Sequence, residues 1–181
     1  MAVIFRPMRS RAAKLTAYKR LSALAAAVLA TATLGLAAAQ APNPITFRSE
    51  IYVVSQVTLA DGGKEERFTP ATQAIPGQVV EYRIFATNSG ETTLPAGVVQ
   101  IYGPVQDGME YVANSATPSS DKLLTEFSVD GVNFSEAPVL VGTETARRVA
   151  EPAEYTMIRW TLLIPLEPGQ EVPFYYRVVL K

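Results

Sequence analysis

One turn motif occurs twice in this chain, and a strand-like segment follows each copy. Residues 76–78 and residues 168–170 both read Pro-Gly-Gln. Apolar and polar side chains alternate after each turn, in the strings VVEYRIFA and EVPFYYRVVL. Side chains two positions apart point to the same face of a strand, so each segment has one face to bury. Two such strands predict a two-layer β domain.

The alternation also predicts which side chains of the two strands point inward. We expect a polar face carrying Glu81, Arg83 and Arg177, which lean outward. Trp160 stands in a third alternating segment, residues 157–164, and is expected to anchor the core. The predicted core is Phe47, Ile51, Val53, Val80, Tyr82, Ile84, Trp160, Leu162, Val172, Phe174 and Tyr176.

The remaining strand candidates come from shorter alternating runs between turn residues. Residues 45–59 alternate, and residues 64–68 are predicted to return as a charged edge strand. Asp130-Gly131, between two apolar triplets, predicts a two-residue hairpin, whereas residues 142–153 are charged and read as irregular. Weaker strand candidates are residues 98–102, 109–113 and 139–141. The first of these ends at a Tyr-Gly-Pro string. No helical apolar period is sustained after residue 39, so we expect an all-β antiparallel sandwich of about seven or more strands.

The first 39 residues differ in kind from the rest. Six basic side chains precede an apolar run over residues 21–39, which ends in Ala37-Ala38-Ala39. This order predicts a helical secretory signal peptide, cleaved before Gln40. A short leader (40–44) and one β domain (45–181) would follow, in the periplasm, on the cell surface or secreted. The alternative is an uncleaved membrane anchor, because the apolar run is nearly long enough to span a bilayer.

Charge and residue types exclude several function classes. The whole chain has 16 basic and 17 acidic residues, and the six basic residues before position 21 leave the remainder acidic, so no nucleic-acid partner is expected. The chain has no His and no Cys, which excludes Ser-His-Asp and Cys-His catalysis and the usual zinc sites. Four aspartates in turns are interpreted as turn formers rather than calcium ligands: Asp61, Asp107, Asp121 and Asp130. We therefore expect no catalytic residue, no cofactor and no metal site.

Several short strings, in their order and spacing, resemble a known bacterial family. The strings are PGQ at 76–78, Tyr82, NSG at 88–90, Gly108, YV at 111–112, SA at 115–116, FSVDG at 127–131, YTMIRWT at 155–161 and PG at 168–169. Over residues 45–181 they resemble the surface-repeat family catalogued as domain of unknown function eleven. This resemblance implies an immunoglobulin-like β-sandwich in a cell-surface or periplasmic setting, with no established reaction.

These observations together favour a non-enzymatic, exported cell-envelope module with a structural or accessory role. Its partner would be another surface protein or a cell-wall polymer, with membrane contact only through an uncleaved signal segment. The candidate surface contacts are Phe85, Tyr175 and Arg159. All three occupy positions whose side chains are expected to point outward from their strands. The alternatives are a carbohydrate-binding domain and a carboxylate-dependent glycan hydrolase, since paired carboxylates need no other residue type.

Overall fold

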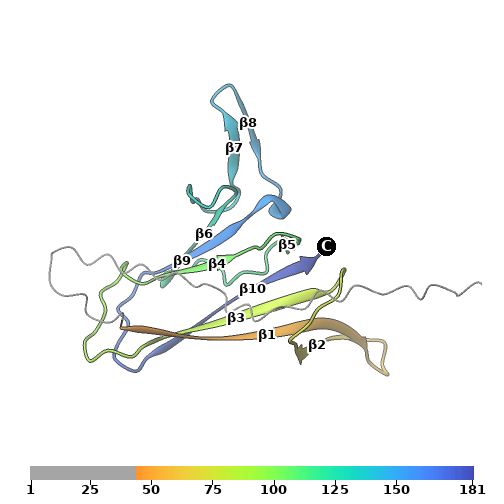
Figure 1. Cartoon of the computed structure of the whole chain (residues 1–181), viewed down its shortest axis with the longest axis horizontal. Helices are drawn as coiled ribbons and strands as arrows, with labels where there is room; N and C mark the ends of the chain where they lie inside the picture. The colour runs from red at the N-terminus through yellow and green to blue at the C-terminus, as the bar shows by residue number, and fades with distance from the viewer. Residues whose placement is uncertain (1–43) are drawn as a thin grey trace, which may run out of the picture.

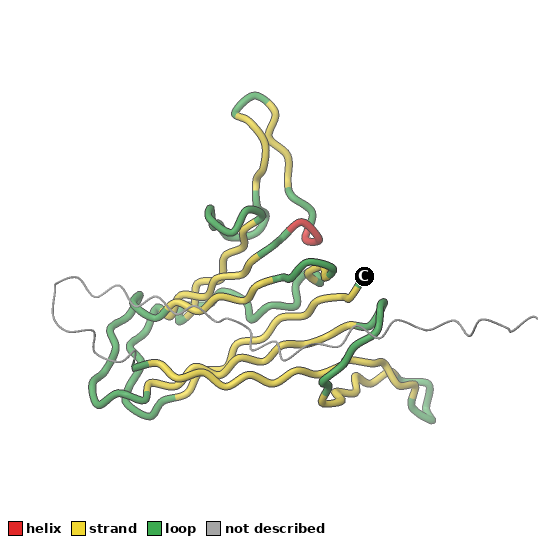
Figure 2. The backbone as a smooth tube through the Cα atoms, in the orientation of Figure 1, coloured by secondary structure: helices red, strands yellow, loops and turns green. Residues whose placement is uncertain are grey.

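Ten strands in two main sheets and one separate hairpin make up residues 44–181, the part of the chain that the computed structural model describes (Figures 1 and 2). The first sheet has the order β2-β1-β3-β10-β5 and contains β1 (Ile45–Thr58), β2 (Lys64–Pro70), β3 (Val79–Asn88), β5 (Met109–Tyr111) and β10 (Glu171–Leu180). The second has the order β4-β9-β6 and contains β4 (Gln100–Pro104), β6 (Leu123–Ser128) and β9 (Met157–Leu162). The hairpin consists of β7 (Leu140–Thr143) and β8 (Ala146–Val149), and one 3-10 turn, η1 (Pro152–Glu154), follows it.

The all-β antiparallel expectation is confirmed, and both sheets contribute to one core. The predictions for residues 1–39 and for residues 40–43 of the leader lie outside the described residues. Within the described part, no helix is long and apolar enough to cross a membrane. The strand order differs from the immunoglobulin constant-type order, in which the last strand lies beside the one before it. Here β10 lies between β3 and β5, whereas β9 belongs to the other sheet.

The two Pro-Gly-Gln turns are closed by the same side-chain hydrogen bond. In the first turn, the backbone N–H of Ile75 donates to Oε1 of Gln78 at 3.0 Å. In the second, the N–H of Glu167 donates to Oε1 of Gln170, also at 3.0 Å. The glycine of each turn has a positive φ, which a residue without Cβ adopts at low cost. The repeated sequence therefore encodes a repeated local structure.

Each of these turns also holds the end of the other strand. The N–H of Gly77 donates to the carbonyl of Leu180, at the end of β10, over 2.7 Å. The N–H of Gly169 donates to the carbonyl of Asn88, at the end of β3, over the same 2.7 Å. Strands β3 and β10 pair antiparallel between the two turns, so the centre of the sheet has an approximate local two-fold symmetry. We call this paired unit the β3–β10 clasp.

The predicted core is confirmed at its centre and is only partly covered at one side. Trp160 is fully buried, and its ring centroid lies 5.6 Å from that of Phe174. Seven predicted core residues are buried: Val80, Tyr82, Ile84, Trp160, Leu162, Phe174 and Tyr176. The other four are half-buried and pack against that core: Phe47, Ile51, Val53 and Val172. Three of the four lie on β1, which is next to the edge strand β2 of the wider, five-stranded sheet.

Two local predictions are wrong. The chain does turn back at Asp130-Gly131, since Phe127 and Ser135 exchange backbone hydrogen bonds of 2.8 and 3.1 Å. The turn is not the predicted two-residue hairpin, because only Gly131 has a positive φ and residues 132–134 do not form a strand. Instead, Oδ1 of Asp130 accepts the backbone N–H groups of Val132 and Asn133 at 2.8 Å each, and these bonds hold the pKa of its carboxyl well below the usual value. Residues 142–153 are not irregular either, since most of them belong to the β7–β8 hairpin and to η1.

A third difference concerns Gly103, which the sequence suggested as the end of a strand. It lies inside β4, and a Cβ added there would stand 2.9 Å from Cη2 of Trp160. The indole cannot easily move, because it is fully buried and its Nε1 donates to the carbonyl of Thr117 at 3.1 Å. Glycine at this position therefore lets the tryptophan ring fill the space between the sheets.

We expect the substitution Gly103→Ala to lower the free energy of unfolding by about 1–3 kcal/mol, because it overpacks a closed core. Urea unfolding followed by circular dichroism would measure the change. In a Trp160→Phe background the far ring atoms are absent, so the additional cost of Gly103→Ala should shrink. Equal costs in both backgrounds would show that the Trp160 ring is not what excludes a side chain at this position.

Candidate functional site: an aromatic pocket beside a projecting hairpin

The outer face of the five-stranded sheet carries two of the predicted contact residues. Phe85 lies opposite Pro173 in the strand register and Tyr175 lies opposite Arg83, so the two aromatic residues are diagonal neighbours on one face. Tyr175 is 41 % exposed. Phe85 is only half-exposed, and the guanidinium carbon of Arg48 lies 3.7 Å from its ring centroid. The structure thus brings the pair together, but a side chain of the protein itself already covers one of the two rings.

The same outer face contains a charged network centred on Glu81. Glu81 was expected to lean into solvent, yet it is only 4 % exposed. Its carboxylate accepts the Nε–H groups of Arg83 at 2.6 Å and of Arg177 at 2.8 Å. Arg177 also donates two hydrogen bonds to Glu66, each 2.7 Å long, which lower the pKa of the Glu66 carboxyl and raise the pKa of the Arg177 guanidinium. The face of the sheet on which Glu81 lies was predicted correctly, but the burial of its carboxylate was not.

Arg159, the third predicted contact, lies on the other sheet. Its Nε and Nη2 donate to Oε2 of Glu126 at 2.9 and 2.7 Å. Its guanidinium carbon is 4.3 Å from the ring centroid of Phe134. The side chain points outward, as expected, while neighbouring Trp160 points into the core. Arg159 therefore does not join Phe85 and Tyr175 in one surface, and its guanidinium is held by an ion pair and an aromatic ring.

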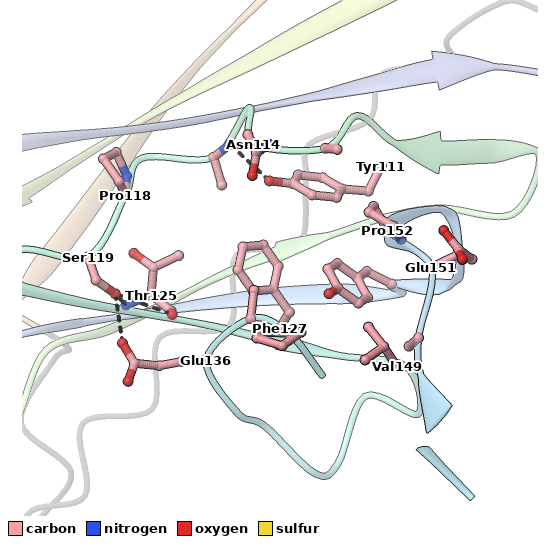
Figure 3. Close-up of a pocket in the computed structure, with 16 residues that line it drawn as sticks. Tyr111, Asn114, Pro118, Ser119, Thr125, Phe127, Glu136, Val149, Glu151 and Pro152 are labelled. Atoms are coloured by element: carbon pink, nitrogen blue, oxygen red, sulfur yellow. Dashed lines mark hydrogen bonds between the residues drawn. The ribbon is translucent and has the colours of Figure 1, made fainter. Parts of the chain in front are cut away.

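A pocket that no sequence pattern indicated opens between the edge strands β5 and β6 (Figure 3). Its volume is about 610 Å³. Three aromatic rings from separate segments meet in its lining: Tyr111 ends β5, Phe127 lies near the end of β6, and Tyr155 follows η1. Their ring centroids are 5.4 Å (Tyr111–Phe127), 5.8 Å (Tyr111–Tyr155) and 5.0 Å (Phe127–Tyr155) apart. These contacts join the two sheets at the open side of the sandwich.

The polar groups of the pocket are few. The Tyr111 hydroxyl accepts the backbone N–H of Ala116 at 3.1 Å, and burial raises the pKa of this phenol. The Ser119 hydroxyl donates to Oε1 of Glu136 at 3.2 Å. Figure 3 shows Glu136 beside Ser119 at one end of the pocket, and Glu151 beside Pro152 at the other. The lining thus combines an aromatic centre with a carboxylate at each end.

The β7–β8 hairpin borders this pocket and projects away from the two sheets (Figure 1). Leu140 and Val149 are direct cross-strand partners in it, and they are 57 % and 53 % exposed. Val149 also lines the pocket. Two-stranded hairpins are marginally stable alone, so an exposed apolar pair on one is a candidate contact for a partner. We refer to Leu140 and Val149 as the hairpin pair.

The base of the hairpin is fixed to the domain. The N–H of Ala150 donates to the carbonyl of Val139 at 2.8 Å, and both residues are buried. Arg148 donates to both carboxylate oxygens of Glu154 at 2.7 and 2.6 Å, and these bonds lower the pKa of Glu154 to about 2. These contacts anchor the hairpin at the mouth of the pocket.

The pocket is lined by a small set of chemical groups. It offers aromatic and proline surfaces, a few hydroxyls and two carboxylates. Among residues 44–181, no group of three or more His, Cys, Asp or Glu side chains could hold a metal ion. Sequence reasoning placed Tyr111, Phe127 and Tyr155 on separate segments and gave no reason to combine them. The pocket is also lined by three prolines, Pro118, Pro138 and Pro152. Proline is common in loops, and these residues were the only local sign in the sequence that loops form a surface there.

The chain matches no protein-family model, no curated protein and no solved structure. The resemblance to the surface-repeat family therefore stays a prediction that rests on the short strings of the sequence.

Proposed function

We propose that this protein is a non-enzymatic module of the cell envelope that binds another surface protein through the aromatic pocket and the hairpin pair. The observation that carries this proposal is a pocket of about 610 Å³ with an exposed apolar pair at its rim. Binding pockets commonly have volumes of 300–1,000 Å³ and mostly apolar linings. Aromatic residues are also enriched in the buried centre of protein interfaces.

The proposal also includes export from the cytoplasm and a relation to the surface-repeat family that the sequence resembles. The basic, apolar and small residues of positions 1–39 follow the order of a secretory signal, and this supports a location outside the cytoplasm. The two-sheet architecture is compatible with an immunoglobulin-like surface domain, although β10 and β9 lie in different sheets. Within the proposal, the pocket and the hairpin pair are the adhesive part of such a domain.

The covering of Phe85 on the outer sheet face favours a protein partner over a polysaccharide. Sugars stack on exposed ring faces, and Phe85, one of the two rings suggested for this role, has Arg48 over it at 3.7 Å. Tyr175 would then act alone on that face. A carbohydrate-binding domain remains the alternative, and it predicts that Tyr175→Ala releases the protein from wall polysaccharide. The glycan hydrolase alternative would use Glu136 and Glu151, and it predicts reducing ends released from polysaccharide substrates.

Crosslinking at the hairpin pair tests the proposal. A photoreactive phenylalanine analogue at position 149 should give a discrete protein adduct on irradiation of intact cells. The matched control is position 132, where Val132 is 76 % exposed and does not line the pocket. We expect no adduct there. A polysaccharide adduct at position 149 would instead favour the carbohydrate alternative, and the absence of any adduct at position 149 would oppose the proposal.

Once that partner is purified, Val149→Asp should weaken its binding tenfold or more. The substitution removes an apolar contact worth about 1.5–3 kcal/mol when buried and adds a charge to the interface. Val132→Asp should leave the affinity unchanged. Because both valines are exposed in the free protein, neither variant should change the melting temperature appreciably, and calorimetric titration would then report binding alone.

A further inference from the structure

The charged side chains that line the pocket are all acidic. Its lining contains two glutamates and no basic residue. The arginine nearest to Glu151 in the sequence, Arg148, donates to both oxygens of Glu154. Glu136 forms no ion pair with any residue of the described part, and a single serine hydroxyl orients its carboxylate. This exposed carboxylate, at the end of the pocket beside Ser119, is complementary to a cation.

The aromatic residues at the centre of the pocket provide a second attraction for a cation. Three rings lie within 5.0–5.8 Å of one another, and each residue is 5–9 % exposed. A cation that enters the pocket meets the part of these rings that lines it, and cations bind favourably to aromatic rings. Figure 3 shows Phe127 between the ends of the pocket that carry Glu136 and Glu151. A group with an apolar stem and a charged head would cover the ring with its stem and reach a carboxylate with its head.

Tyr155 adds a hydroxyl without a protein partner to the lining of the pocket. The residue is 5 % exposed, and its hydroxyl makes no hydrogen bond within residues 44–181. Every side-chain oxygen or nitrogen that is completely shielded in that part of the chain has a partner. The Tyr155 hydroxyl therefore keeps some access to solvent, and the residue lines the pocket. A largely buried hydroxyl without a partner is costly unless a ligand or water satisfies it.

We propose that the pocket binds a basic side chain, arginine or lysine, supplied by the partner protein. The aliphatic stem lies on the aromatic rings, the head group pairs with Glu136, and the Tyr155 hydroxyl hydrogen-bonds to the inserted segment. Arginine should bind more tightly than lysine, because its planar guanidinium stacks on rings and pairs with a carboxylate through two hydrogen bonds. This inference rests on the proposed function, since it specifies which group of the partner enters the pocket.

Small probes test the inference without a known partner. Nα-acetyl-arginine amide should shift the amide resonances of Thr125 and Phe127 in the nuclear magnetic resonance spectrum of the purified protein, with a Kd on the order of 1 mM for a fragment of this size. Nα-acetyl-citrulline amide has nearly the same shape without the charge. We expect it to bind at least tenfold more weakly, and Nα-acetyl-lysine amide to bind between the two.

Two variants locate the interaction. Glu136→Gln should weaken binding of the arginine probe about tenfold and leave binding of the citrulline probe unchanged. Tyr155→Phe keeps the ring and should weaken binding of both probes severalfold. The matched control is Glu91→Gln, because Glu91 is exposed and does not line the pocket. Circular dichroism and melting temperature would establish that each variant is folded.

The outcomes separate this inference from the proposed function. Equal binding of the arginine and citrulline probes, or no shift at Thr125 and Phe127, would overturn the basic-side-chain inference. If a protein still crosslinks at position 149 in that case, the proposed function stands and the partner inserts an uncharged group. A crosslinked partner whose binding the arginine probe inhibits, but the citrulline probe does not, would support both.

Discussion

Replacing Trp160 with alanine should lower the free energy of unfolding by about 3–5 kcal/mol, because it removes a large aromatic side chain and leaves a cavity. The indole is fully buried between the sheets and contacts the rings of Phe174 and Tyr176. The substitution also removes the donor that satisfies the Thr117 carbonyl. This loss is a large fraction of the roughly 5–15 kcal/mol that stabilises a typical domain.

Unfolding in urea, followed by far-ultraviolet circular dichroism, measures this effect. Fluorescence is unsuitable, since Trp160 is the only tryptophan in the chain. The matched control is Tyr175→Ala, which removes an aromatic ring that is 41 % exposed and should cost far less. A Trp160→Ala variant with an unchanged unfolding midpoint would show that the indole is not the centre of the core.

Replacing Glu81 with alanine should lower the free energy of unfolding by about 2–3 kcal/mol, because two arginines then lose a shared, buried carboxylate. The side chain of Glu81 is 5 % exposed, whereas those of Arg83 and Arg177 are 34 % and 23 % exposed. The arginines can therefore regain some hydration, and Arg177 keeps its hydrogen bonds to Glu66. For this reason the expected loss lies below the full cost of breaking a buried ion pair.

The matched control for Glu81 is Glu50→Ala on the same sheet face. Glu50 pairs with Arg48, whose side chain is 52 % exposed, so its loss should cost less than about 1 kcal/mol. Raising the salt concentration should reduce the Glu50 effect and leave most of the Glu81 effect, because buried pairs are screened less. Similar costs for the two variants at low salt would show that Glu81 is effectively solvated.

The central strands were predictable because they have a strong local pattern. The predicted bounds of the last strand, residues 171–180, agree with those of β10, and the apolar parity of β3 and β10 places Ile84 and Phe174 in the core. Parity tells which face a side chain is on, but not what lies on that face. Glu81 is on the expected outer face, and it is buried because Arg83 and Arg177 extend over it.

The pocket was not predictable from any local pattern. Tyr111, Phe127 and Tyr155 come from three segments, and only the pairing of the strands brings their rings together. Gly103 was misinterpreted for a similar reason, because the indole that requires a glycine there belongs to the neighbouring strand. Sequence reasoning thus recovered the properties of single strands and missed those that depend on contacts between strands.

The position of β10 determines when this domain can finish folding. It is the last of the ten strands along the chain, yet it lies inside the five-stranded sheet, where Val178 pairs with Val80. Pairing residues so far apart requires closure of a long loop, which makes topologies of this kind slow to fold. Before β10 is synthesised, β3 pairs with β1 on one side and keeps an open edge on the other, where β10 later binds. The strands made earlier can pair among themselves, but β5 and β3 lie in one continuous sheet only after β10 has been inserted between them.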